Sequence, residues 1–204
     1  MQFNSTRISV RVLILAAICC SLTPLCLRAD IITFSAPLSG GNENPVVVTP
    51  ATGFTTVSLD TASNLLTIYV TFTDLTTPTT AAHIHCCVSA GGNAGVATTV
   101  PAFPTPPFPL GVTSGTYDGM LDLTLASSYN PAFITANGDL ASAEAAFVTG
   151  FENGMTYLNI HTSQNPGGEI RAFLTTPEPP SGVLAGLALA ALWMARRRAV
   201  RVSN

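Results

Sequence analysis

The strict alternation of apolar and polar side chains over residues 66–72 constrains the fold of this chain more than any other feature. The apolar set is Leu66, Ile68, Val70 and Phe72, and the polar set between them is Thr67, Tyr69 and Thr71. Successive side chains of a β-strand point to opposite faces of the sheet, so a period of two predicts a strand with one buried face.

Shorter runs of the same kind recur along the chain with turn residues between them. They predict six further strands, at residues 31–36, 52–59, 79–88, 115–125, 155–162 and 168–174. One helix is predicted at residues 140–148, with Asp139 as its N-cap. The proline-rich residues 101–109 predict a stiff, exposed loop. We therefore expect a mostly β fold, a single antiparallel β-sandwich or flattened barrel with one short helix.

Residues 1–29 have the layout of a signal peptide. Arg7 and Arg11 precede an apolar run at residues 12–20, and the small residue Ala29 follows as a cleavage point. This predicts export of the protein, with residues 30–176 as the mature domain. A cleaved signal peptide implies a signal peptidase as a partner.

The C-terminal segment, residues 177–204, has three parts in order. Pro177-Glu178-Pro179 comes first, an apolar run at residues 182–195 follows, and Arg196-Arg197-Arg198 comes last. As a helix the run would be about 21 Å long, against about 30 Å for a bilayer core, so it is either a buried helix or a marginal membrane span. The arginines favour the membrane, because positive charge resists translocation.

Removal of both ends leaves a strongly acidic domain. Residues 30–176 hold one basic residue, Arg171, against ten carboxylates, which gives a net charge of −9. Such a domain repels nucleic acids and anionic membrane surfaces, so we expect neither as a partner. A domain of this size can bury a core of its own, which favours a single domain.

The three histidines are the strongest candidates for metal ligands. His83 and His85 lie two residues apart, hence on one face of a predicted strand, with imidazoles about 6–7 Å apart along it. His161 on another strand could supply a third nitrogen, a donor set that suits copper or zinc. Glu169 is a candidate fourth ligand, or an acceptor that orients an imidazole.

A buried polar cluster is the alternative for the same residues. In it, His85 or His161 bonds to the turn at residues 165–168, and Glu169 pairs with Arg171 or with a backbone amide. Glu169 and Arg171 are two apart on a predicted strand, so their side chains share a face. Both interpretations stay open at the level of the sequence.

Cys86 and Cys87 are the only cysteines between residues 30 and 176. They could form a vicinal disulfide, bind a soft metal ion such as Cu(I), or remain free thiols. An oxidising compartment favours the disulfide. The sequence contains no calcium-loop spacing, nucleophile elbow or phosphate-binding glycine loop, so it indicates no enzymatic reaction.

Three motifs together resemble the CHRD domain, named for chordin: Ala81-Ala82-His83-Ile84-His85, residues 115–123 (GTYDGMLDL), and residues 157–171 (YLNIHTSQNPGGEIR). The resemblance covers residues 32–174 and implies an extracellular, mostly β domain. This chain has Cys86-Cys87 where the family often has Gly-Pro. The C-terminal segment resembles a PEP-CTERM sorting signal, which implies a bacterial protein held transiently in the membrane and then processed by an exosortase-type enzyme.

These patterns support two hypotheses about function. The first is a secreted or cell-surface, non-enzymatic module of an extracellular matrix or biofilm, whose partners would be extracellular polysaccharide or matrix proteins. The second is an extracellular protein that binds copper or zinc through His83, His85 and His161. One form of this hypothesis makes the bound metal redox-active.

Overall fold

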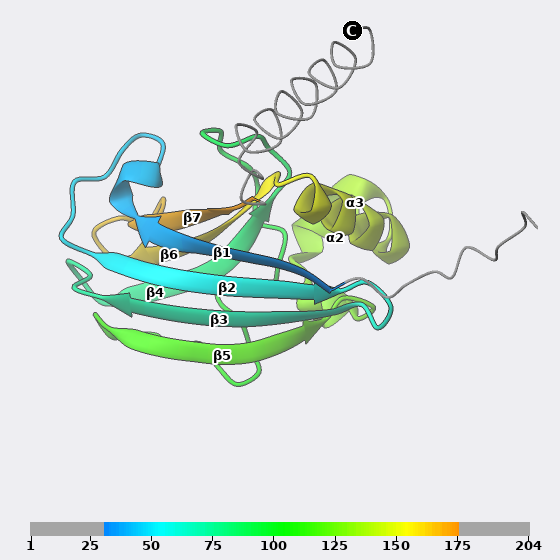
Figure 1. Cartoon of the computed structure of the whole chain (residues 1–204), viewed down its shortest axis with the longest axis horizontal. Helices are drawn as coiled ribbons and strands as arrows, with labels where there is room; N and C mark the ends of the chain where they lie inside the picture. Colours follow the sequence, from blue (N-terminus) through cyan, green and yellow to red (C-terminus); the bar gives the residue numbers. More distant parts are fainter. Residues whose placement is uncertain (1–30, 176–204) are drawn as a thin grey trace, which may run out of the picture.

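Seven antiparallel strands form one curled sheet in the computed structural model, which describes residues 31–175 (Figure 1). The strands are β1 (Ile31–Ser39), β2 (Thr52–Asp60), β3 (Leu65–Thr73), β4 (Thr79–Cys86), β5 (Gly115–Asp122), β6 (Thr156–Thr162) and β7 (Ile170–Leu174). Their order across the sheet is β4-β6-β7-β1-β2-β3-β5. The predicted mostly β, antiparallel fold is confirmed, in the form of a half-barrel made from a single sheet.

The curl comes from the junction between β1 and β7. β1, β2 and β3 pair with one another along their whole lengths, whereas β1 and β7 pair only at Ser39 and Arg171. This short contact lets the two parts of the sheet diverge. In Figure 1, β4 and β6 pass behind β1 and β2, whereas β7 lies beside β1.

The core lies inside the curl. The apolar set of β3, including Leu66, Ile68 and Val70, is fully buried, whereas Tyr69 on the opposite face is 41% exposed, as the alternation predicts. β4, β6 and β7 add Ile84, Ile160 and Ile170 to the same core. Burial of this apolar surface is the main stabilising contribution to the fold.

Two helices, α2 (Pro131–Asn137) and α3 (Leu140–Glu152), lie beside one end of the sheet. The predicted helix is confirmed as α3, but it continues to Glu152. The Asp139 side chain caps it by accepting from the Ser142 amide at 2.7 Å. α2 was not predicted. It begins with good local signals, an Asn130 N-cap and Pro131, but it is short and buries none of its residues, so it leaves no apolar periodicity in the sequence.

The proline-rich loop differs from its prediction. Its prolines 101, 104, 106 and 107 are exposed, but Phe103 and Phe108 between them are only 1% and 3% exposed. Phe103 stacks on Tyr117 of β5, with ring centroids 5.3 Å apart. The loop therefore closes the open side of the core. The strand predicted at residues 115–125 ends at Asp122, and Leu125 beyond its end is 50% exposed.

Within residues 31–175, none of the helices has the length and apolar character that a membrane crossing requires. The predicted signal peptide at residues 1–29, the apolar run at residues 182–195, the Pro177-Glu178-Pro179 motif and the cluster Arg196-Arg197-Arg198 all lie outside the described residues.

Candidate metal centre

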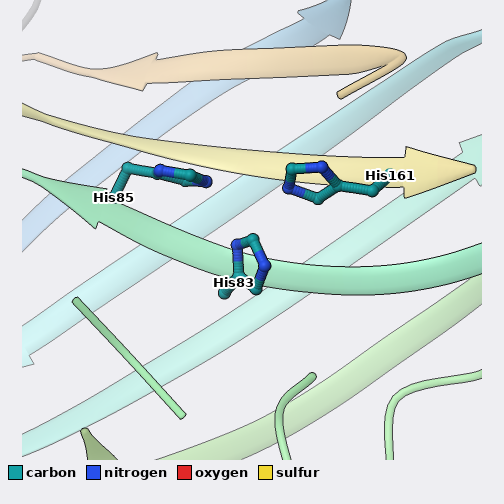
Figure 2. Close-up of side chains that lie close together, drawn as sticks. All are labelled: His83, His85 and His161. Carbon is teal, nitrogen blue, oxygen red and sulfur yellow. The ribbon is translucent and has the colours of Figure 1, made fainter. Parts of the chain in front are cut away.

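The pairing of β4 with β6 brings His83, His85 and His161 together (Figure 2). The register places Asn159 opposite His83 and Ala81 opposite His161, so the three imidazoles share one face of the two strands. Ala82, Ile84 and Ile160 occupy the other face, inside the core. Anchoring of these apolar residues in the core therefore orients the histidines.

One possible ligand atom of each imidazole lies within 4.8 Å of the corresponding atoms of the other two. The ring centroids of His83 and His85 are 4.9 Å apart, and those of His83 and His161 are 4.5 Å apart. The sequence spacing predicted a wider separation of His83 and His85, since it treated the rings as perpendicular to the strand. In the fold the rings tilt toward a common point.

Backbone carbonyls determine the tautomers of two imidazoles. His85 Nδ1 lies 2.8 Å from the Ala94 carbonyl oxygen, and His161 Nδ1 lies 3.0 Å from that of Pro166. A carbonyl only accepts, so each Nδ1 carries the proton and each Nε2 has a free lone pair. Both Nε2 atoms, together with Nδ1 of His83, are buried and lack a hydrogen-bond partner among the described residues. Such an arrangement is typical of metal-binding imidazoles.

Burial keeps the three imidazoles neutral. They are 5–7% exposed, and this desolvation lowers the pKa of His83 to about 3 and that of His85 to about 4. Burial also lowers the pKa of His161, partly offset by its bond to Pro166. At neutral pH all three present lone pairs, the form that binds a metal ion.

Tyr157 and Arg171 form a column behind His85. The Tyr157 ring stacks on the His85 ring with centroids 4.6 Å apart and planes 7° apart. The Arg171 guanidinium lies 4.7 Å from the centroid of the Tyr157 ring. The Tyr157 hydroxyl accepts a hydrogen bond from the Ala94 amide at 3.1 Å. Ala94 therefore positions Tyr157 with its amide and determines the His85 tautomer with its carbonyl.

Arg171 is 1% exposed and does not pair with Glu169. Its Nη1 donates to the Gly92 carbonyl and to Asn93 Oδ1, its Nε donates to the Asn42 carbonyl, and the same Nε lies 3.6 Å from a Glu43 carboxylate oxygen. Burial raises the pKa of Glu43 to about 7, although Arg171 and Asn159 both act in the opposite direction. Arg171 was one of two partners that the buried-cluster alternative allowed for Glu169. This pair does not form, because the loop that follows β1 supplies the carboxylate beside Arg171.

Glu169 is fully buried and already has four donors. Its carboxylate accepts from Thr49 Oγ1 at 2.6 Å, Thr162 Oγ1 at 2.7 Å, the Thr76 amide at 2.8 Å and Thr76 Oγ1 at 2.9 Å. Burial alone would raise its pKa, but these bonds outweigh burial and lower it. The backbone-amide alternative is therefore the one that the structure contains. Glu169 ties three chain segments together and lies outside the histidine cluster.

Cys86 and Cys87 are joined by a vicinal disulfide at the end of β4. Cys86 is 5% exposed and Cys87 is exposed. Both sulfurs lie beside Gly150 of α3, and neither belongs to the histidine cluster. They therefore support the helix and do not contribute thiolates to the candidate metal centre.

Sequence analysis missed Tyr157, Asn159 and Glu43 as neighbours of the site. Tyr157 and Asn159 precede His161 by four and two residues on β6, so the period of two places them on its face. That signal was available. Glu43 had none, since its position depends on the fold of a loop far away in the sequence.

Comparison with known proteins gives one family match. The family model of the CHRD domain matches residues 34–174. Neither the curated proteins nor the solved structures compared with this chain include a match.

Proposed function

The chain belongs to the CHRD domain family, and we propose that it is an extracellular or cell-surface module that binds one transition-metal ion, copper or zinc, through His83, His85 and His161. Family membership is consistent with a location outside the cell. The activity that we propose is metal binding, and the proposal includes no chemical reaction.

One observation carries this proposal: three neutral, buried imidazoles whose ligand atoms lie within 4.8 Å of one another. Two nitrogens bound to the same tetrahedral ion at about 2.0–2.1 Å lie about 3.4 Å apart. Closing the remaining gap requires rotation of the rings toward the ion. Three protein nitrogens also leave a coordination position for water or another small ligand.

The experiment is elemental analysis of the purified full chain after incubation with copper or zinc and removal of unbound metal. We expect one ion per chain. His83→Ala and His161→Ala should each remove most of it, whereas Thr80→Ala, an exposed substitution on the same strand, should retain it. Equal metal content in the histidine variants and the Thr80 variant would refute the proposal.

We further propose that the module is delivered to an extracellular matrix or biofilm by its C-terminal segment, where it contacts polysaccharide or matrix proteins. The support is the order of Pro177-Glu178-Pro179, the apolar run and Arg196-Arg197-Arg198. An exosortase-type enzyme would act near the first motif after signal peptidase has removed residues 1–29.

Replacement of Arg196, Arg197 and Arg198 by alanine in the full chain tests this route. The triple variant should accumulate unprocessed or be released early, as judged by mass and cell fractionation. Arg201→Ala removes one basic residue outside the cluster and serves as the control. Normal processing and localisation of the triple variant would show that the cluster has no sorting role.

A further inference from the structure

We propose that the three-histidine centre selects monovalent copper, Cu(I), over Cu(II) and Zn(II). This inference rests on the proposed metal-binding function and specifies which ionic charge the site prefers. Its argument comes from the donors, from their burial and from the charge behind them.

The donor set contains no anion. All three candidate ligands are neutral imidazoles, and the cluster includes no carboxylate or thiolate from residues 31–175. The nearby carboxylates are bound elsewhere, Glu169 by three threonines and Glu43 beside Arg171. A bound ion therefore keeps its full charge, +1 for Cu(I) and +2 for Cu(II) or Zn(II).

Burial penalises the higher charge. The three histidines are 5%, 7% and 6% exposed, so an ion among them loses most of its hydration. The free energy of transferring an ion from water to a low-dielectric site grows with the square of its charge, which makes the cost about fourfold larger for a divalent ion. Three nitrogens complete a trigonal Cu(I) site, whereas Zn(II) and Cu(II) need further ligands.

The charge behind the site acts in the same direction. Arg171 is the only arginine or lysine among the described residues, and it is 1% exposed. Its guanidinium lies over the Tyr157 ring, and the Tyr157 ring stacks on the His85 ring. Coulomb repulsion between this cation and the bound ion is twice as large for a divalent ion, and burial leaves it poorly screened. The Glu43 carboxylate, 3.6 Å from Arg171 Nε and with a pKa of about 7, offsets only part of this repulsion at neutral pH.

Competition titration of the full chain tests the proposal. Cu(I) is added anaerobically against a bicinchoninate competitor, and Cu(II) and Zn(II) are each added against a chelator of known affinity. We expect the Kd for Cu(I) to be at least 100-fold lower than that for either divalent ion. Equal or tighter binding of Cu(II) or Zn(II) would overturn the selectivity and leave the proposed function standing. Failure of all three ions to bind would overturn both.

Asn159→Asp supplies a matched test of the charge argument. Asn159 lies opposite His83 in the β4–β6 register and opposite Arg171 in the β6–β7 register, so the substitution adds a carboxylate of the same shape between them. The preference for Cu(I) over Cu(II) should fall at least tenfold. Asn64→Asp, the same substitution in the β2–β3 turn, should leave it unchanged.

An unaltered preference in a folded Asn159→Asp chain would refute the electrostatic basis of the selectivity. Circular dichroism establishes whether that chain is folded. The ratio of the wild-type affinities decides the proposal by itself where the variant does not fold.

Discussion

The ring centroids of His83 and His161 lie 4.5 Å apart, although the two residues are not paired with each other in the sheet. His83 pairs with Asn159, and His161 pairs with Ala81. The two histidines are thus diagonal neighbours on adjacent antiparallel strands, a relationship that lets long or aromatic side chains meet. A slip of one residue in this register would turn one of them into the core.

Metal ions should stabilise the fold through this pair. A ligand that binds only the folded state, at 100 times its Kd, adds about 2.7 kcal/mol to the free energy of unfolding. For a domain of this size that corresponds to a rise in Tm of about 5–10 °C. Differential scanning fluorimetry with copper or zinc should show the rise for the wild type and none for His161→Ala. A similar rise in that variant would place the metal elsewhere.

Acid should destabilise the metal-free fold. The pKa values of His83 and His85 are about 3 and about 4 in the fold, below the ordinary value of 6.5. At pH values between the folded pKa and 6.5, these histidines are protonated in the unfolded chain but not in the folded one. The free energy of unfolding therefore falls as pH drops from 6.5 toward 4. The slope is up to about 1.4 kcal/mol per pH unit for each group. Urea denaturation across this pH range measures it.

Glu43 supplies a control of opposite sign for this pH dependence. Its pKa is raised from 4.5 to about 7, so it stabilises the fold at low pH and loses that contribution as pH rises from 4.5 to 7. Glu43→Gln should therefore steepen the loss of stability in acid, whereas His83→Gln should make it shallower. Identical pH profiles for both variants and the wild type would contradict this assignment.

Gly168→Ala should destabilise the turn behind the histidines by about 2–4 kcal/mol. Gly168 has φ +125°, and a Cβ there would overlap the side-chain amide of Asn159. The neighbouring Gly167 has open space at the same point, so Gly167→Ala should change stability by less than about 0.5 kcal/mol. Chemical denaturation compares the two. Equal effects would mean that the contact with Asn159 is unimportant.

Gly150→Ala should also destabilise, although alanine is favoured over glycine in a helix by about 1 kcal/mol. The new Cβ would lie 2.5 Å from Cys86 Sγ and 2.7 Å from Cys87 Sγ. We expect a loss of about 1–3 kcal/mol. Replacement of both cysteines by alanine should remove most of this penalty in a double-mutant cycle measured by urea denaturation. A penalty that persists without the sulfurs would exclude them as its cause.

Most of the secondary structure could be predicted because its signals are local. The alternation in β3 and the Asp139 N-cap of α3 depend on residues within one element. α2 escaped because none of its side chains is fully buried; Phe133 and Ile134 pack against the core but stay partly exposed. The inward position of Phe103 and Phe108 escaped because prolines dominate the local pattern, while their burial depends on Tyr117 and Phe72 in distant strands.

The candidate site could be predicted only in part. His83 and His85 share a face because they are two apart, and the motif around His161 identified the third imidazole. Glu169 and Arg171 are also two apart, which predicted a shared face and made a mutual ion pair plausible. Their partners come instead from Thr49, Thr76 and Thr162 in one case and from Glu43 in the other. Carboxylates and guanidinium groups bind whichever partners the folded loops place beside them.

The sequence by itself determined which residues form strands, which face of each strand is apolar, and the family to which the domain belongs. Those properties follow from side-chain order within short segments. Only the tertiary structure decided that β4 pairs with β6, that Arg171 stacks behind Tyr157 and that Glu169 lies outside the histidine cluster. These contacts join residues far apart in the chain, and they form because the whole sheet, with all its pairings and its buried core, is more stable than the alternatives.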